Sequence, residues 1–181
     1  MDNAAEMIFT GDELLRGDAV NTNQAYLGER LLDLGVLATH ALCVADQLPA
    51  IVAAIRESLA RGPAVLLLSG GLGPTEDDLT REATAEALGR PLEHHEDLLE
   101  HIRERFESRG YIMGDSNRKQ ASLPRGASPI LRGGGRDPRR RTCHTTPGPM
   151  GVGRDSLPPG ASPRPGGGGM LPALERGAGH D

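Results

Sequence analysis

The sequence predicts an α/β fold: a three-layer α/β/α domain on a mostly parallel, doubly wound sheet, followed by a largely disordered tail. Apolar runs typical of strands alternate with stretches of helical period through roughly the first 125 residues. Glycine and proline then become dense, and no hydrophobic period survives. The length of 181 residues suits one ordinary α/β domain and excludes two large ones.

Each predicted element has a local signal. Strands are predicted at apolar runs over residues 7–9, 36–45 and 64–68. Helices are predicted from a cap at Thr22 or Asn23 to Gly35, and over residues 48–61, 79–88 and 94–109. The run at 64–68 is unbroken, which indicates a central parallel strand covered on both faces. The apolar faces of the first two helices are expected to be Tyr26, Leu27, Leu31, Leu32 and Leu34, then Ile51, Ala54, Ile55 and Leu59.

The amino-acid composition and the net charge argue against several classes of protein and partner. Only 2% of residues are aromatic and the net charge is -5, so a nucleic-acid partner is not expected. The two cysteines, Cys43 and Cys143, form no CxxC pair, which favours a reducing compartment and the cytoplasm. No apolar run approaches the length of a membrane span and no signal-peptide pattern opens the chain, so we expect a soluble protein without a membrane partner.

The chain changes character near residue 131. Residues 1–131 are acidic and are predicted to form the folded domain, whereas residues 132–181 are rich in glycine, proline and arginine. Such a tail buries too little apolar surface to offset roughly 1–2 kcal/mol of backbone entropy per ordered residue. We therefore expect the tail to be mostly disordered.

The most informative segment is the glycine-rich loop at residues 69–80, between a predicted strand and a predicted helix. Glycines there let backbone N–H groups approach an anion, and the next helix adds its positive N-terminus, so phosphate is the expected ligand. Glu76, Asp77 and Asp78 would repel a bare phosphate but could hold Mg²⁺ or a similar divalent cation. The alternative is that the glycines only turn the chain and the acids only favour the helix dipole.

Two further polar segments are candidates for the same site. If the first and third strands are neighbours, Asp12 and Asn21 face Asp78 across one crevice; otherwise Asp12 only ends a strand and Asn23 only caps a helix. Lys119 is the only lysine of the chain, and its point charge suits a phosphate. The alternative is that Lys119 is an exposed loop cation.

Four motifs in order, at residues 10–15, 21–23, 70–80 and 117–120, resemble the N-terminal domain of the CinA (competence/damage-inducible) family. That domain belongs to the molybdopterin-binding superfamily of MoaB, MogA and MoeA. The resemblance covers about residues 4–131 and implies a three-layer α/β/α fold. It also implies cleavage of the pyrophosphate in ADP-ribose with a divalent metal, and the family's separate amidase domain is not expected here.

The resemblance implies roles for particular residues. The metal would polarise the pyrophosphate and activate water. The catalytic residues are expected to be Asp78, Asp12 and Lys119, and the metal ligands Asp78, Asp77 and Asp12. The expected phosphate and nucleotide contacts are Ser69, Gly70, Gly71, Gly73, Thr75, Asn21, Asn23 and Asn117.

Other functions stay open. The crevice also suits a module that binds molybdopterin or another pterin without chemistry. Family members continue after residue 131 with a segment and a strand that are not found here, so the tail is either a shifted reading frame, which would leave an inactive fragment, or a genuine basic tail. The expected partner is a small nucleotide or pterin, and a homo-oligomer is compatible with the family.

Overall fold

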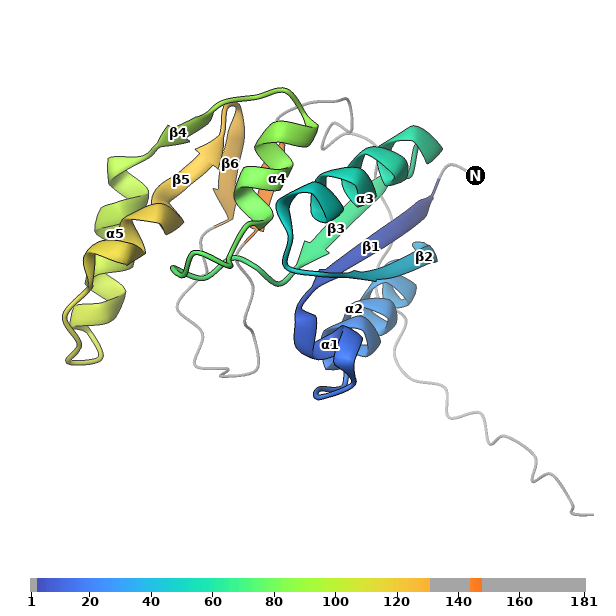
Figure 1. Cartoon of the computed structure of the whole chain (residues 1–181), viewed down its shortest axis with the longest axis horizontal. Helices are drawn as coiled ribbons and strands as arrows, with labels where there is room; N and C mark the ends of the chain where they lie inside the picture. Colours follow the sequence, from blue (N-terminus) through green and yellow to red (C-terminus); the bar gives the residue numbers. More distant parts are fainter. Residues whose placement is uncertain (1–2, 131–143, 148–181) are drawn as a thin grey trace, which may run out of the picture. The chain divides into compact units, whose positions relative to one another are not determined.

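The main sheet of the protein has three parallel strands in the order β2-β1-β3 (Figure 1). The computed structural model describes residues 3–130 and 144–147, all within one compact unit of residues 1–150. The strands are β1 (Ala4–Thr10), β2 (Leu37–Val44) and β3 (Val65–Ser69). The predicted α/β class, with a parallel sheet between helices, is confirmed.

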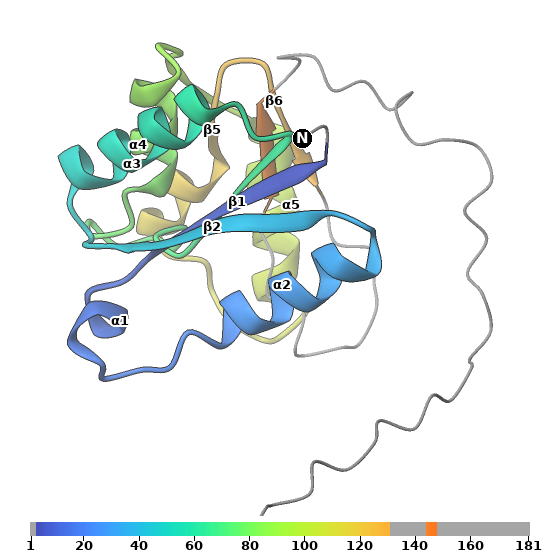
Figure 2. The ribbon, with the colours of Figure 1, turned by 90° about the vertical axis from the view of Figure 1, so that its right-hand side faces the viewer.

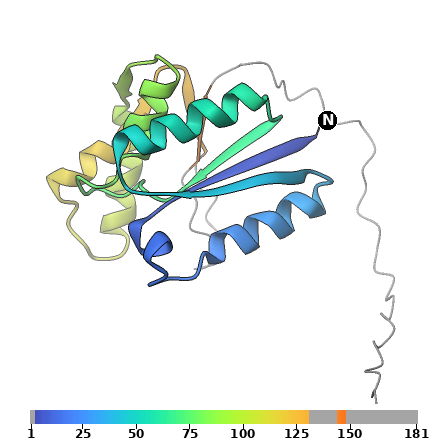
Figure 3. The same cartoon turned by 45° about the vertical axis from the view of Figure 1, so that its right-hand side comes forward.

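Helices cover both faces of this sheet (Figures 2 and 3). One face carries α3 (Leu48–Arg61) and α4 (Thr80–Ala87), and the other carries α1 (Asp12–Arg16) and α2 (Thr22–Asp33). The side chains of β1 alternate between the two layers, as the period of a strand requires. Ile8 packs against α3 and α4, whereas Met7 and Phe9 pack against α2, so β1 is buried on both sides.

The apolar run at residues 64–68 is not the central strand. In the sheet as described, β1 lies in the middle and β3 lies beside it, and Val65 is 37% exposed. By contrast, β1 is buried from Ala5 to Thr10 even though Glu6 and Thr10 are polar. An apolar run reports the hydrophobicity of a strand, but the neighbours of that strand are set by long-range pairing.

Helix α2 differs from its prediction at its cap and on its apolar face. The cap is Asn21, whose side chain accepts a hydrogen bond from the backbone N–H of Gln24 at 3.0 Å. Only Leu31 is buried, whereas Leu32 and Leu34 are about 70% exposed. Tyr26 on α2 is 43% exposed and Leu59 on α3 is 39% exposed. Each helix contacts the sheet along a narrow stripe of its own surface, so the side chains beside that stripe remain exposed to solvent.

The rest of the described chain is smaller and partly antiparallel. Strand β4 (Leu92–His94) pairs with β5 (Ser122–Pro124), and β6 (Ala127–Ile130) pairs with β7 (His144–Pro147). Helix α5 (Glu96–Glu107) packs on the 3-10 helix η1 (Asp115–Ala121) through Leu98, Leu99 and Ala121. Because residues 92–94 pair as a strand, α5 begins two residues later than predicted.

The tail is described only in part. Strand β7 lies inside residues 132–181, for which the sequence predicts mostly disorder, and it is the part of that stretch that the structure describes. The rest of that stretch, and with it the question of a shifted reading frame, lies outside the described residues. Over the residues that are described, no helix is long and apolar enough to cross a membrane.

An ion pair between a buried carboxylate and a partly exposed arginine joins the middle strand to α3. Glu6 is 2% exposed, and its two carboxylate oxygens accept hydrogen bonds from Arg61 at 2.8 and 2.7 Å. Arg61 also donates to Ser58 at 3.0 Å, and the imidazole of His40 lies 3.3 Å from the Glu6 carboxylate. These contacts satisfy a charge that would otherwise be buried alone.

We predict that Arg61→Met lowers the free energy of unfolding at neutral pH by clearly more than a matched surface substitution, because it leaves the buried Glu6 carboxylate without its main partner. Urea unfolding measures this loss. Arg56→Met is the matched control, since Arg56 lies on the same helix but its side chain is 58% exposed and lies 4.0 Å from the Glu86 carboxylate. The control should change stability by less than about 0.5 kcal/mol. Equal losses in the two variants would contradict this role for the ion pair.

The same pair predicts a loss of stability in acid. Hydrogen bonds from Arg61 lower the pKa of Glu6 below its ordinary value of 4.5, although burial opposes them. A lowered pKa stabilises the fold above the unfolded-state value, and that contribution is lost as the pH falls through the folded-state value. Urea unfolding between pH 6 and pH 3 should therefore show a larger loss in the wild type than in Arg61→Met.

Candidate functional site

The loops after the three parallel strands meet at one edge of the sheet, as predicted. Gly70 and Gly71 follow β3 and have φ angles of +104° and +57°, which favour glycine. A Cβ atom on Gly70 would collide with the backbone carbonyl of Thr10, and one on Gly71 would lie 2.5 Å from the hydroxyl of Thr80. The end of β1 and the glycine loop therefore touch backbone to backbone.

Asp78 holds the glycine loop in shape. Its Oδ1 accepts a hydrogen bond from the Gly73 N–H at 2.7 Å, and its Oδ2 accepts from the N–H and the hydroxyl of Thr75 at 2.8 and 2.5 Å. Burial would raise the pKa of Asp78, but these bonds and the charge of Arg81 outweigh it and lower the pKa. The carboxylate and the Gly73 N–H, both predicted to act on a ligand, are thus bonded to each other.

Thr80 and Arg81, the first two residues of α4, donate side-chain hydrogen bonds to carbonyl groups of the same loop. The Arg81 guanidinium is 2% exposed and donates to the carbonyls of Leu72 and Gly73, each at 2.7 Å. The Thr80 hydroxyl donates to the Gly70 carbonyl at 2.8 Å. The buried Arg81 guanidinium therefore contacts the backbone of a loop that carries three consecutive acidic residues, at positions 76–78.

Thr10 contributes a buried hydroxyl at the point where β1 meets the glycines. The residue is 4% exposed, and its Oγ1 would lie 2.5 Å from a Cβ on Gly70 and 3.0 Å from one on Gly71. Among the described residues, this Oγ1 has no hydrogen-bond partner. Buried hydroxyls are normally paired, so this one is free to hydrogen-bond with a ligand atom that approaches Gly70 and Gly71.

Asp12 and Asp46 join the loops that follow β1 and β2. The N–H of each residue donates to the carboxylate of the other, both at 3.1 Å. Burial raises the pKa of Asp46, and the nearby carboxylates of Asp12, Glu13 and Asp77 raise it further. Asp46 is not among the site residues predicted from the sequence. It follows a predicted strand, so its place at the shared sheet edge was the signal that could have found it.

Asn23 and Asn21 have different surroundings. The side-chain amide of Asn23 donates to the Ser69 hydroxyl at 3.0 Å, which brings these two predicted contacts together beside the glycine loop. Asn21 instead caps α2, and its amide also contacts the sulfur of Cys43 at 3.6 Å. Only Asn23 therefore lies directly on the loop.

Helix η1 places the motif at residues 117–120 against the glycine loop. Lys119 donates to the carbonyl of Thr75 at 2.9 Å and lies 3.3 Å from the Glu82 carboxylate. Gln120 donates to the carbonyl of Leu72 at 3.2 Å, and the buried Asn117 amide donates to Gln120 at 3.0 Å. Asn117 therefore supports Gln120, and Lys119 lies against the glycine loop.

The three predicted metal ligands do not assemble around one point. Asp78 is bonded within its loop, Asp12 is bonded to Asp46 and lies 3.7 Å from Arg16, and Asp77 is exposed. Across the part of the chain that the structure describes, no three His, Cys, Asp or Glu side chains form a group that could hold a metal ion. These residues do not fit a divalent metal centre held by protein side chains alone.

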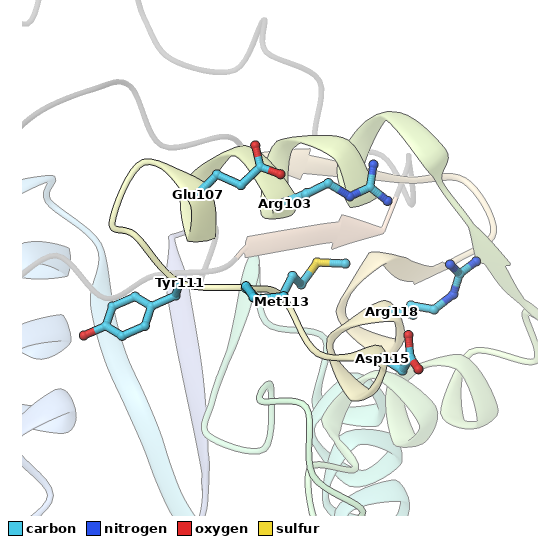
Figure 4. Close-up of a pocket in the computed structure, with 7 residues that line it drawn as sticks. Arg103, Glu107, Tyr111, Met113, Asp115 and Arg118 are labelled. Carbon is cyan, nitrogen blue, oxygen red and sulfur yellow. The ribbon is translucent and has the colours of Figure 1, made fainter.

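A separate hollow of about 250 Å³ lies between α5 and η1 (Figure 4). It is lined by Arg103, Glu107, Tyr111, Ile112, Met113, Asp115 and Arg118. Its two guanidinium groups and two carboxylates offset each other, so the lining favours no charged class of ligand. The glycine loop remains the better candidate site.

The chain matches the family model described as "Probable molybdopterin binding domain" over residues 6–160. It is 50% identical over 125 residues to a CinA-like protein of Anaeromyxobacter dehalogenans, covering 69% of this chain and 30% of the relative. A CinA-like protein of Frankia casuarinae is 45% identical over 141 residues, or 74% of this chain and 32% of the relative. The chain thus spans about a third of the length of these relatives.

A solved structure is also similar. The crystal structure of the protein CinA from Thermoplasma acidophilum superposes with a TM-score of 0.65 at 34% sequence identity. The match covers 74% of this chain and 77% of that one.

We predict that Asp78→Asn lowers the free energy of unfolding by about 1–3 kcal/mol, because its amide would set an N–H₂ group against the donors of Gly73 or Thr75. Urea unfolding measures the loss, and faster hydrogen exchange at the Gly73 amide locates it. Asp77→Asn, which removes the neighbouring exposed charge, is the control and should leave both unchanged. Unaltered exchange at Gly73 in Asp78→Asn would rule out this role.

Proposed function

The chain belongs to the probable molybdopterin binding domain family, and from that premise we propose that its glycine loop binds the phosphate group of a small pterin or nucleotide. The observation that carries the proposal is the Thr10 hydroxyl, which is buried and unpaired among the described residues and lies against Gly70 and Gly71. A phosphate oxygen at these glycines would give that hydroxyl a partner. The strand-loop-helix setting is one in which proteins commonly bind phosphate.

The charge around the loop supports an anionic ligand. The sequence suggests that Glu76, Asp77 and Asp78 would repel phosphate unless a cation intervened. Arg81 supplies a buried positive charge under the loop, and its field contributes to the lowered pKa of Asp78. Lys119 adds a second positive charge at Thr75. The loop therefore carries its own compensation for part of the acidic charge.

The finer proposal is that the site cleaves the pyrophosphate of ADP-ribose. Water would attack one phosphorus atom and the bridging P–O bond would break, giving AMP and ribose 5-phosphate. The reaction needs a group that can take a proton from water. Asp46 is the candidate base, because burial raises its pKa and it lies at the same sheet edge.

For a divalent cation, the proposal concerns only an ion that binds together with the ligand. No described group of side chains could hold the ion unaided. Mg²⁺ in proteins is commonly held by one or two carboxylates together with substrate phosphates. We therefore propose that any such ion enters with the phosphates of the ligand.

Thermal unfolding with and without ligand tests the proposal. A ligand at a hundredfold excess over its dissociation constant should add about 2.7 kcal/mol, or several degrees in Tm. Pyrophosphate and ADP-ribose, each with Mg²⁺, are the probes, and AMP release is assayed in parallel. A shift with AMP supports hydrolysis, and a shift without AMP supports binding alone. No shift with either probe would overturn phosphate binding at this loop.

We predict that Thr80→Val destabilises the fold and that Thr10→Val does not. Thr10→Val removes an unpaired buried hydroxyl and should leave Tm unchanged or raise it, while weakening pyrophosphate binding about five- to tenfold, the equivalent of one hydrogen bond. Thr80→Val removes the bond to the Gly70 carbonyl and should lower Tm. Calorimetric titration and thermal unfolding give both values. Unchanged affinity in Thr10→Val would remove this hydroxyl from the site.

A further inference from the structure

Lys119 is held beside the glycine loop by a residue outside the predicted site. Its Nζ donates to the Thr75 carbonyl at 2.9 Å and lies 3.3 Å from Oε1 of Glu82, in the first turn of α4. The two side chains are 25% and 29% exposed, so the ion pair is partly withdrawn from water. The ammonium group is therefore fixed by the loop and by the helix that follows it.

The ion pair with Lys119 involves only one of the two carboxylate oxygens of Glu82, Oε1. Within the described residues, Oε2 is buried and has no hydrogen-bond partner. An unpaired buried carboxylate oxygen costs free energy, and a partly buried ion pair returns little net stability. Stability alone is therefore a poor explanation for a glutamate at this position.

We propose that Glu82 is a positioning residue, which holds Lys119 at the rim of the glycine loop so that a phosphate ligand meets an ammonium group already in place. The inference rests on the proposed function. A lysine side chain has a long flexible stem and loses rotamer freedom when it binds an anion. An ion pair made beforehand removes that loss from the binding step.

The single lysine of the chain gives the experiment its probe. Labelling with lysine that carries ¹³C at the ε carbon yields one methylene signal, from Lys119. In the wild type without ligand, the two ε-methylene protons should be inequivalent, as in a held side chain. In Glu82→Gln they should become equivalent and narrow. A Lys119 signal that is already mobile in the wild type, or unchanged in Glu82→Gln, would overturn the proposal.

Pyrophosphate binding provides the second readout. We expect Glu82→Gln to bind pyrophosphate five- to tenfold more weakly than Glu86→Gln. The control removes the same charge from the same helix, but the Glu86 side chain is 53% exposed and lies 4.0 Å from Arg56. Glu82→Gln should add no further loss in a Lys119→Met background. Equal or tighter binding by Glu82→Gln relative to Glu86→Gln would show that Glu82 does not prepare Lys119.

The two proposals fail separately. If pyrophosphate leaves the wild-type Lys119 signal and Tm unchanged, phosphate binding fails, and the holding of Lys119 by Glu82 is still decided by the signal without ligand. If the wild type binds and the two glutamine variants bind equally, only the positioning role fails. Should Glu82→Gln not fold, Glu82→Asp, which keeps the charge but shortens the reach, gives the same comparison.

Discussion

The middle strand β1 is the constraint on which the rest of the described structure depends. It is hydrogen-bonded to β2 on one edge and to β3 on the other, and it is buried between two helical layers. Because all three strands are parallel, their carboxyl ends lie together, and the loops that follow must share one edge of the sheet. The Glu6–Arg61 pair fixes α3 to this strand. The site is thus a consequence of how β1 is paired and covered.

Part of the negative charge of the glycine loop is offset by a positive charge within the fold. Three consecutive acids would make an isolated segment hostile to anions, but Asp78 is turned inward to three loop donors and Arg81 lies buried beneath. The hydrogen bonds that shape the loop therefore stabilise the charged form of Asp78. Arg81 offsets part of the acidic charge of the loop from within the fold.

The contacts that complete the site join residues far apart in the chain. Asn23 reaches Ser69, Asp12 exchanges hydrogen bonds with Asp46, and Lys119 binds the carbonyl of Thr75. Each contact depends on two elements being packed at a fixed place, so the site can be no more rigid than the packing of α2, α4 and η1. The proposed ligand would bind across these junctions rather than on a single segment.

The sequence by itself determined the alternation of strands and helices, the glycine loop and the shared edge of the sheet to which the loops after the parallel strands lead. These follow from local periodicity and from the rule for parallel strands. Tertiary structure alone decided that β1 rather than β3 is central, that Asp78 bonds to its own loop and that Arg81 and Glu82 serve that loop. Pairing, burial and the direction of a side chain depend on residues distant in sequence, which local patterns do not contain.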